Sequence, residues 1–123
     1  MTTDRRVVKR LFKELCAQPR LLFPEERRPL NAPYKHGVYF IRKGQKVLHV
    51  GRTARAKGGL HQRLSNHLHG SSSFTNEFLD GAGKKLRHGY TYQYLEVKDR
   101  RHRALLEAYA IGTLCPAHLG LGE

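Results

Sequence analysis

The chain has 123 residues, a length that suits one domain with a single modest core and is too short for two independent ones. Its 23 Lys and Arg outnumber its 10 Asp and Glu, and the formal charge of +13 attracts polyanions, so nucleic acid is the expected partner. The apolar runs are far shorter than the roughly 20 residues of a membrane span, and the charged N-terminal stretch lacks a secretory-signal pattern. We therefore expect a cytoplasmic protein with no membrane partner.

The N-terminal part of the chain predicts one amphipathic helix and an irregular arm. Apolar residues at positions 7, 8, 11, 12, 15 and 16 repeat with a helical period, from a start near Thr3 or Asp4 to an end before Pro19. Residues 20–35 contain three prolines and no sustained period, which indicates a connection that runs over the core. We assign residues 1–35 to this N-terminal helix and proline-rich arm.

The basic residues are concentrated in the middle of the chain. Residues 27–76 contain no Asp or Glu, although they hold ten Lys and Arg and five His. An ordinary soluble surface mixes charges of both signs. A long basic segment instead neutralises phosphates and gains affinity by releasing their counterions. We expect this segment to contact nucleic acid, and the alternative is a solvated basic face without a ligand.

The stretch HGVYFIRKGQKVLHVGRT, residues 36–53, predicts a β-hairpin. With Gly44 at the centre of a three-residue loop, Tyr39 pairs with His49 across the hairpin. The side chains expected on the same face are Ile41 and Val47. The side chains expected on the opposite face are Val38, Phe40, Leu48 and Val50. A phenol and an imidazole that converge in a partly apolar cleft suit a small-molecule or phosphate site, and otherwise a hydrogen-bonded polar pocket.

The rest of the chain predicts helices and one further strand. A Gly-Gly break at positions 58 and 59 precedes LHQRLSNHL, whose leucines at 60, 64 and 68 mark one helical face. FTNEFLD reads as a short helix, and residues 88–97 as a strand rich in Tyr, Thr and Val. Asp99 can cap a last helix over about residues 100–114, which ends at Pro116. Cys16 and Cys115 are too few for a disulfide framework and are expected to be reduced.

Arg63 and His67 lie four residues apart on the helix after the hairpin, so both project from one face, away from the leucines. A guanidinium and an imidazole held together suit an in-line phosphoryl displacement, in which the Arg neutralises charge and the His handles protons or holds an oxygen. The same pair also occurs on solvated helix faces.

Glu107 is the only charged side chain of ALLEAYAIGTLC, residues 104–115. An ionised carboxylate left unpaired among apolar neighbours would be costly. It therefore requires a cation, which is either an Arg in a structural salt bridge or a divalent metal ion that the carboxylate ligates. Both alternatives fit the sequence.

The order of these features resembles the GIY-YIG nucleases. Gly-Val-Tyr at positions 37–39 stands where the family has Gly-Ile-Tyr, and His-Val-Gly at positions 49–51 stands where it has Tyr-Ile-Gly. Arg63 and His67 stand where the family has a catalytic Arg and, four residues on, a His or Tyr. Glu107 matches its single metal-binding Glu. The resemblance covers roughly residues 36–118.

The resemblance implies an α/β fold of the α+β kind, with a small mixed three-stranded sheet flanked by helices and the N-terminal helix added to it. Residues 36–123 would then form a GIY-YIG-like nuclease domain. The implied activity is that of an endonuclease that hydrolyses phosphodiester bonds in nucleic acid, here expected to be DNA. The implied cofactor is one Mg²⁺ or Mn²⁺ ion, with no small-molecule cofactor.

The resemblance also implies roles for individual residues. Tyr39 would take a proton from the attacking water and pass one onward to His49 or His67, Arg63 would stabilise the developing charge, and Glu107 would hold the metal ion. A nearby cation such as Arg52 could instead lower the pKa of the phenol. The basic residues expected to contact phosphates without reading bases are Arg52, Arg55, Lys57, Lys84 and Lys85.

The sequence departs from the family pattern at two positions. His49 replaces the Tyr of the second motif, and His118, a further candidate for the site, follows Pro116 where many members have an Asn. A His can donate and accept as a phenol does, although its ordinary pKa lies near neutrality, so we expect the chemistry to persist with altered pH dependence. The alternative function is a non-catalytic nucleic-acid-binding module that keeps the fold and the basic surface.

Overall fold

The structure, a computed structural model, describes residues 3–54 and 57–119. Its elements are α1 (Thr3–Cys16), β1 (Leu21–Leu22), β2 (Gly37–Lys43), β3 (Lys46–Arg52), α2 (Gly59–Leu68), α3 (Ser73–Phe78), the 3-10 helix η1 (Gly83–Arg87), β4 (Tyr90–Glu96) and α4 (Arg100–Leu114). The strands form one sheet in the order β1-β4-β2-β3. The predicted α+β class is confirmed. The sheet gains the two-residue β1, and every pairing is antiparallel where a mixed sheet was expected.

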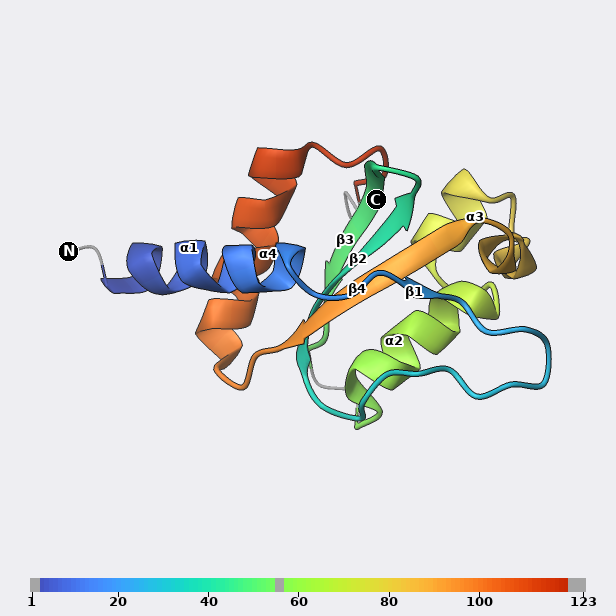
Figure 1. The fold of residues 1–123 in the computed structure, drawn as a ribbon, viewed down its shortest axis with the longest axis horizontal. Helices are drawn as coiled ribbons and strands as arrows, with labels where there is room; N and C mark the ends of the chain where they lie inside the picture. Colours follow the sequence, from blue (N-terminus) through green and yellow to red (C-terminus); the bar gives the residue numbers. More distant parts are fainter. Residues whose placement is uncertain (1–2, 55–56, 120–123) are drawn as a thin grey trace.

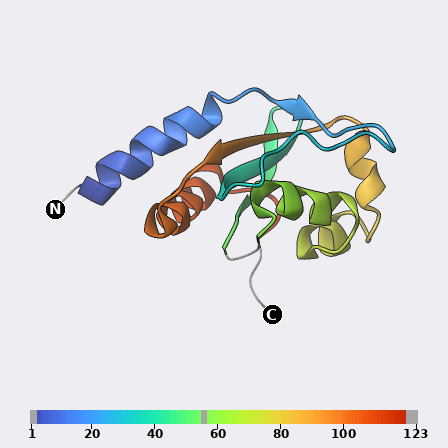
Figure 2. The same ribbon diagram turned by 90° about the horizontal axis from the view of Figure 1, so that it is seen from below.

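Helices cover both faces of the sheet (Figure 1). One core lies between the sheet and helices α1 and α4, and includes Val38, Phe40 and Leu106. The other lies between the sheet and α2, and includes Tyr39 and Leu64. Adjacent residues of β2 therefore point into different cores, as the two-residue period of a strand requires. Both views place α1 at the opposite end of the molecule from α3 (Figure 1, Figure 2).

The β2–β3 hairpin differs from the predicted hairpin in its register. The observed pairs are Lys43 with Lys46, Arg42 with Val47, Ile41 with His49, Phe40 with Val50 and Tyr39 with Gly51. The loop contains two residues where three were predicted, and Leu48 has no partner of its own. It forms a β-bulge, in which two residues of β3 oppose one of β2. Tyr39 is thus paired with Gly51, and its predicted pairing with His49 was wrong.

The side chains of Tyr39 and His49 nevertheless lie on one face. Near these residues the observed register differs from the predicted one by two positions, and a shift of two leaves every side chain on its original face. Beyond the bulge the shift is one position, so Val47 and Leu48 exchange faces relative to the prediction. The ring centroids of Tyr39 and His49 are 5.9 Å apart.

The glycines of the two short motifs allow close packing. A Cβ on Gly51 would collide with the hydroxyl and ring of Tyr39, and a Cβ on Gly37 would collide with the carbonyl of Leu95. Thr53 then joins the two strand ends, because its hydroxyl accepts from the Gly37 amide at 3.0 Å and its amide donates to the Gly37 carbonyl at 3.0 Å. The phenol of Tyr39 can lie across β3 only because position 51 has no side chain.

The proline-rich arm runs over the core as predicted. Two of its side chains, Phe23 and Leu30, are buried. Its last residues meet the start of α2, where the amides of Leu60 and His61 donate to the carbonyls of Lys35 at 2.8 Å and Pro33 at 2.9 Å. The first amides of a helix have no partner inside the helix, so these bonds fix the arm to α2.

Helix α4 begins and ends where the sequence predicts. The Asp99 carboxylate accepts from the amide of His102 at 2.8 Å and caps the helix. Cys115 follows the helix in the left-handed region, with φ 47°, and is exposed, whereas Cys16 is partly buried. Both thiols are free.

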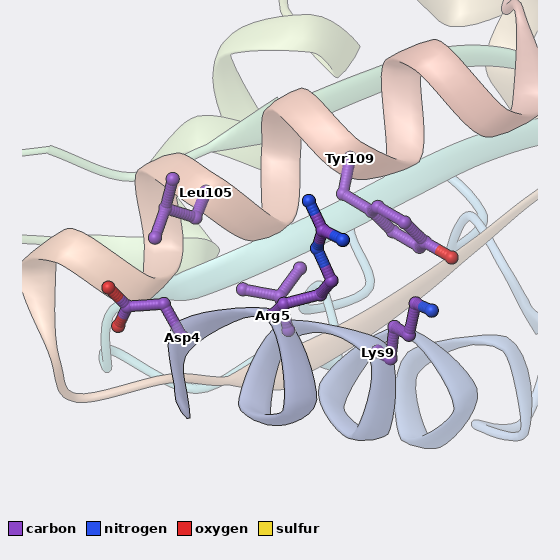
Figure 3. Close-up of a pocket in the computed structure, with 6 residues that line it drawn as sticks. Asp4, Arg5, Lys9, Leu105 and Tyr109 are labelled. Atoms are coloured by element: carbon purple, nitrogen blue, oxygen red, sulfur yellow. The ribbon is translucent and has the colours of Figure 1, made fainter. Parts of the chain in front are cut away.

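A hollow of about 480 Å³ lies between α1 and α4, beside Arg5, Lys9 and Tyr109 (Figure 3). It is on the face of the sheet opposite to Tyr39, so it is separate from the candidate site. None of the helices in the described ranges combines the length and the hydropathy that a bilayer span demands.

Candidate active site

The predicted site residues of the hairpin and of α2 meet in the core beside α2. The Tyr39 hydroxyl lies 2.6 Å from Nε2 of His67, and both side chains are buried. The His49 ring lies 4.9 Å from that of His67 and 5.1 Å from that of His118, between ring centroids. Because His67 is only 1% exposed, the alternative of a solvated helix face is excluded for this residue.

Hydrogen bonds around His67 determine its tautomer. The Thr75 hydroxyl lies 2.6 Å from the His67 carbonyl, which can only accept, so the Thr75 proton points there. Ser72 Oγ lies 3.0 Å from Thr75 Oγ1 and must donate to it. The two lone pairs of Ser72 then accept from the Thr75 amide at 3.1 Å and from Nδ1–H of His67 at 2.6 Å. His67 is therefore assigned its proton on Nδ1, and its Nε2 accepts from the Tyr39 hydroxyl.

Burial keeps these groups neutral at pH 7. It raises the pKa of Tyr39 to about 12, and the charge of Arg63 lowers that pKa while the charge of Glu107 raises it further. Burial also lowers the pKa of His67 well below its ordinary value, and the charges of His49 and Arg63 lower it further. The pKa of His49 falls to about 3, again chiefly through burial. An exposed His titrates near neutrality, but the buried His49 imidazole titrates well below it.

Arg63 supplies a positive charge to the same site. It precedes His67 by one turn of α2, and its charge lowers the pKa values of Tyr39, His49 and His67. Its Nε is buried and has no hydrogen-bond partner within residues 3–54 and 57–119. A buried donor without a partner is costly, so this N–H group favours an anionic ligand.

Glu107 forms an ion pair with Arg52. Its Oε1 accepts from Nε of Arg52 at 2.9 Å, and the side chains are 26% and 35% exposed, respectively. The sequence had left a structural salt bridge with an Arg open as one alternative for Glu107. The Arg that forms it is Arg52, which we had expected to contact a phosphate. The charge of Glu107 also raises the pKa of Tyr39, and Arg52 directly follows Gly51, the partner of Tyr39 in the sheet, so the ion pair lies at the edge of the site.

His118 comes from the segment after α4 and reaches the bulge of β3. Its amide donates to the Leu48 carbonyl at 2.8 Å, and its Nδ1 lies 3.0 Å from Nδ1 of His49. Its Nε2 lies 3.4 Å from a carboxylate oxygen of Glu77. His118 therefore contacts His49, and His49 in turn lies beside Tyr39.

The other predicted phosphate contacts in the described ranges are exposed. Lys57 is exposed just before α2, and Lys84 and Lys85 are exposed on η1. Arg55 lies outside the described residues.

Sequence reasoning missed Ser72 and Thr75. The run GSSS at positions 70–73 precedes the predicted short helix FTNEFLD and was given no role in the site. The available signal was that a Ser directly before a helical segment is a preferred N-cap, and Ser72 indeed caps α3. The capping bond fixes the side chain of Ser72, and the same oxygen accepts from Nδ1–H of His67.

The fold is that of a GIY-YIG endonuclease domain. Its three-dimensional structure resembles the GIY-YIG N-terminal endonuclease domain of UvrC from Thermotoga maritima bound to its catalytic divalent cation, magnesium, with a TM-score of 0.54 and 21% identity over 76% of this chain and 97% of that chain. A point mutant of the same domain, also bound to its catalytic divalent cation, gives a TM-score of 0.52 and 21% identity over 71% of this chain and 84% of that chain. By sequence, the chain matches no protein-family model and no curated protein.

Proposed function

We propose that this protein is a metal-dependent endonuclease that hydrolyses phosphodiester bonds in nucleic acid, with DNA as its substrate. The observation that carries this proposal is the buried hydrogen-bond chain from Tyr39 through His67 to Ser72, next to an Arg63 N–H group without a described partner. The GIY-YIG fold and the cation bound by the UvrC domain support it.

Glu107 is the residue that would hold the metal ion. Within the described parts of the chain, no three His, Cys, Asp or Glu side chains are arranged to hold an ion together. Mg²⁺ keeps several waters and commonly binds one or two carboxylates together with substrate phosphates, so a single carboxylate at the edge of the site fits it. Once bound, such an ion neutralises phosphate charge and lowers the pKa of a water.

Tyr39 and His67 would move the proton of the attacking water. Tyr39 accepts a proton from the water as its own proton passes to Nε2 of His67, which is already the acceptor of that hydrogen bond. His67 is favoured over His49 as the onward acceptor because, among the described residues, the Tyr39 hydroxyl is hydrogen-bonded to His67 and not to His49. Burial disfavours the charged forms of both Tyr39 and His67 at rest, so both transfers accompany the attack.

Arg63 would stabilise the charge that develops on the phosphate. Its Nε–H is shielded from solvent, and a donor in a site that excludes water contributes more than a solvated guanidinium does. The exposed residues Lys57, Lys84 and Lys85 remain the proposed contacts to neighbouring phosphates. Arg52, which now pairs with Glu107, would join them if that carboxylate held a metal ion.

A plasmid-nicking assay tests the function directly. Supercoiled DNA is incubated with the protein and Mg²⁺ or Mn²⁺, and a parallel sample contains EDTA. We expect nicking with either ion and none with EDTA. Binding of DNA without nicking under every condition would instead support the non-catalytic nucleic-acid-binding module.

DNA affinity is expected to fall steeply with salt. If about four phosphates are neutralised, the association constant falls by about 10² between about 50 and 200 mM salt, because each contact releases counterions. Fluorescence anisotropy of a labelled duplex in EDTA measures this without cleavage. A flat salt dependence would contradict the assignment of nucleic acid as the partner.

Ser72→Ala is expected to reduce nicking by about 10-fold to 100-fold, since groups that orient a functional His typically contribute this much. Without its acceptor, Nδ1–H of His67 no longer determines the tautomer. The ¹⁵N chemical shifts of the His67 ring report the tautomer and should change. Loss of the α3 cap costs about 1 kcal/mol, so nicking is measured well below the melting temperature.

Ser72→Thr is the matched control, because its hydroxyl retains both the cap and the acceptor. We expect it to restore nicking and the wild-type ¹⁵N shifts. Unchanged shifts in Ser72→Ala would contradict the assigned tautomer.

A further inference from the structure

A second hollow, of about 410 Å³, lies between the proline-rich arm and α2. We call it the arm groove. The charged and aromatic side chains that line it are Arg27, Arg28, Tyr34, His61, His69 and Arg87. None of the described residues that line it is acidic. The arm runs alongside α2 in Figure 1, and the hydrogen bonds from the first amides of α2 hold the two together.

Tyr34 presents a flat ring to solvent in this groove. One face of the ring stacks on the ring of His61, with centroids 4.4 Å apart and planes at 16°. The side chain is nevertheless 67% exposed. An aromatic ring that is held on one side and open on the other is the platform on which proteins stack an unpaired nucleic-acid base.

Three guanidinium groups give the groove its charge. Arg27 and Arg28 are exposed, and neither forms an ion pair with any residue in the described ranges. Glu25 and Glu26 precede them in the chain but do not line the groove. Arg87 instead holds the wall in place, since its Nη1 donates to the carbonyl of Pro24.

We propose that the arm groove binds a single-stranded segment of nucleic acid, with phosphates on Arg27 and Arg28 and a base stacked on Tyr34. This binding proposal rests on the proposed function, because the single strand would be the part of the nuclease substrate that lies beyond the cleaved bond. A single strand is favoured over a duplex, since the bases of a duplex are stacked on one another and offer no face to Tyr34.

The position of the groove separates it from the candidate active site. Helix α2 carries Arg63 and His67 on the flank that faces Tyr39. It carries His61 and His69 on the other flank, as the 3.6-residue repeat places them. A strand in the arm groove therefore does not occupy the site of hydrolysis. The best substrate would combine a duplex with an unpaired strand.

Binding measured with the full chain in EDTA tests this without cleavage. The probes are a labelled single-stranded DNA, an RNA of the same sequence and the corresponding DNA duplex. Tyr34→Leu is expected to weaken binding of the single strands about tenfold, the effect of losing one stacked base, and to leave duplex binding within about twofold. Tyr34→Phe keeps the ring and should bind as the wild type does.

Arg28→Ala tests the charge of the groove. It is expected to weaken single-strand binding and to lower the slope of log K against log salt by about one. Arg6→Ala removes the same charge from an exposed position on α1 and should leave the slope unchanged. Arg28 is chosen over Arg27 because Arg27 has φ 69°, where a substitution also alters the backbone.

Equal affinity of Tyr34→Leu and wild type for single strands would overturn the proposal, and so would equal losses for single strand and duplex. Competition by polyglutamate as effective as that by single-stranded DNA would also overturn it, because the groove would then be a general anion surface. Nicking assays separate this result from the proposed function. Tyr34-dependent binding without any nicking supports the groove and contradicts the nuclease, whereas duplex nicking with Tyr34-independent binding does the reverse.

Discussion

Glu107→Gln is expected to abolish nicking, with a loss of about 10³-fold or more, if this carboxylate holds the metal ion. Gln preserves the shape of the side chain and removes its charge. DNA binding should remain or become tighter, because a negative charge near the phosphates is lost. Nicking, anisotropy and thermal melting of the metal-free proteins measure the three effects.

The stability of Glu107→Gln follows from the exposure of the ion pair. A fully buried Arg left without its carboxylate would cost on the order of 3 kcal/mol. The pair with Arg52 is about one-quarter to one-third exposed, so solvent screening reduces the expected cost to about 1 kcal/mol. A small fall in melting temperature together with complete loss of nicking is therefore the signature of a metal ligand.

Arg52→Gln is the matched control for this experiment. It breaks the same ion pair from the other side and leaves the carboxylate in place, so metal-dependent nicking should persist, with weaker DNA binding. If Glu107 serves only to pair with Arg52, both variants should lose similar stability and both should nick DNA. Nicking by Glu107→Gln would thus remove the metal-ligand assignment.

Tyr39→Phe is expected to lower the nicking rate by about 10² or more, because it deletes the hydroxyl proposed to relay the proton and keeps the ring. The fold should persist, since the ring still fills the space over Gly51. Nε2 of His67 loses its partner in a buried position, which costs about 1 kcal/mol. The rate of plasmid nicking and the melting temperature measure these effects.

Tyr92→Phe provides a control of the same chemical kind. Tyr92 is also buried, with its pKa raised to about 12, and its hydroxyl donates to the Asn31 carbonyl at 2.8 Å, outside the candidate site. Loss of the Tyr92 hydroxyl should lower the stability of the fold and leave nicking unchanged. Retained turnover in Tyr39→Phe would assign the role of base to His67.

The helices and strands could be predicted because their signals are local. The cap at Asp99, the leucine repeat of α2 and the start of α4 each depend on residues within a few positions of one another. The two-residue β1 had no such signal, because it is a strand only through its pairing with β4. The bulge at Leu48 likewise had no local signal, and its carbonyl accepts from the amide of His118, which is far along the chain.

The candidate site was predicted in part. The faces that carry Tyr39, His49 and His67 follow from the periods of a strand and a helix, and the family resemblance implied that these faces meet in one site. The partner of Glu107 could not be predicted, since Arg52 is 55 residues away and several other Arg residues were available. The role of Ser72 depends on α3 packing beside α2, which no local pattern reveals.

The bulge at Leu48 also makes the hairpin tolerant of changes in length. Without Leu48, the pairs on both sides of it could form one regular ladder, in which Tyr39 still opposes Gly51. Strand β3 thus contains one extra residue, Leu48, between the exposed tip of the hairpin and the candidate site. We expect an insertion or deletion near the tip to be absorbed there, so the exposed end can change in length while the register at Tyr39 stays constant.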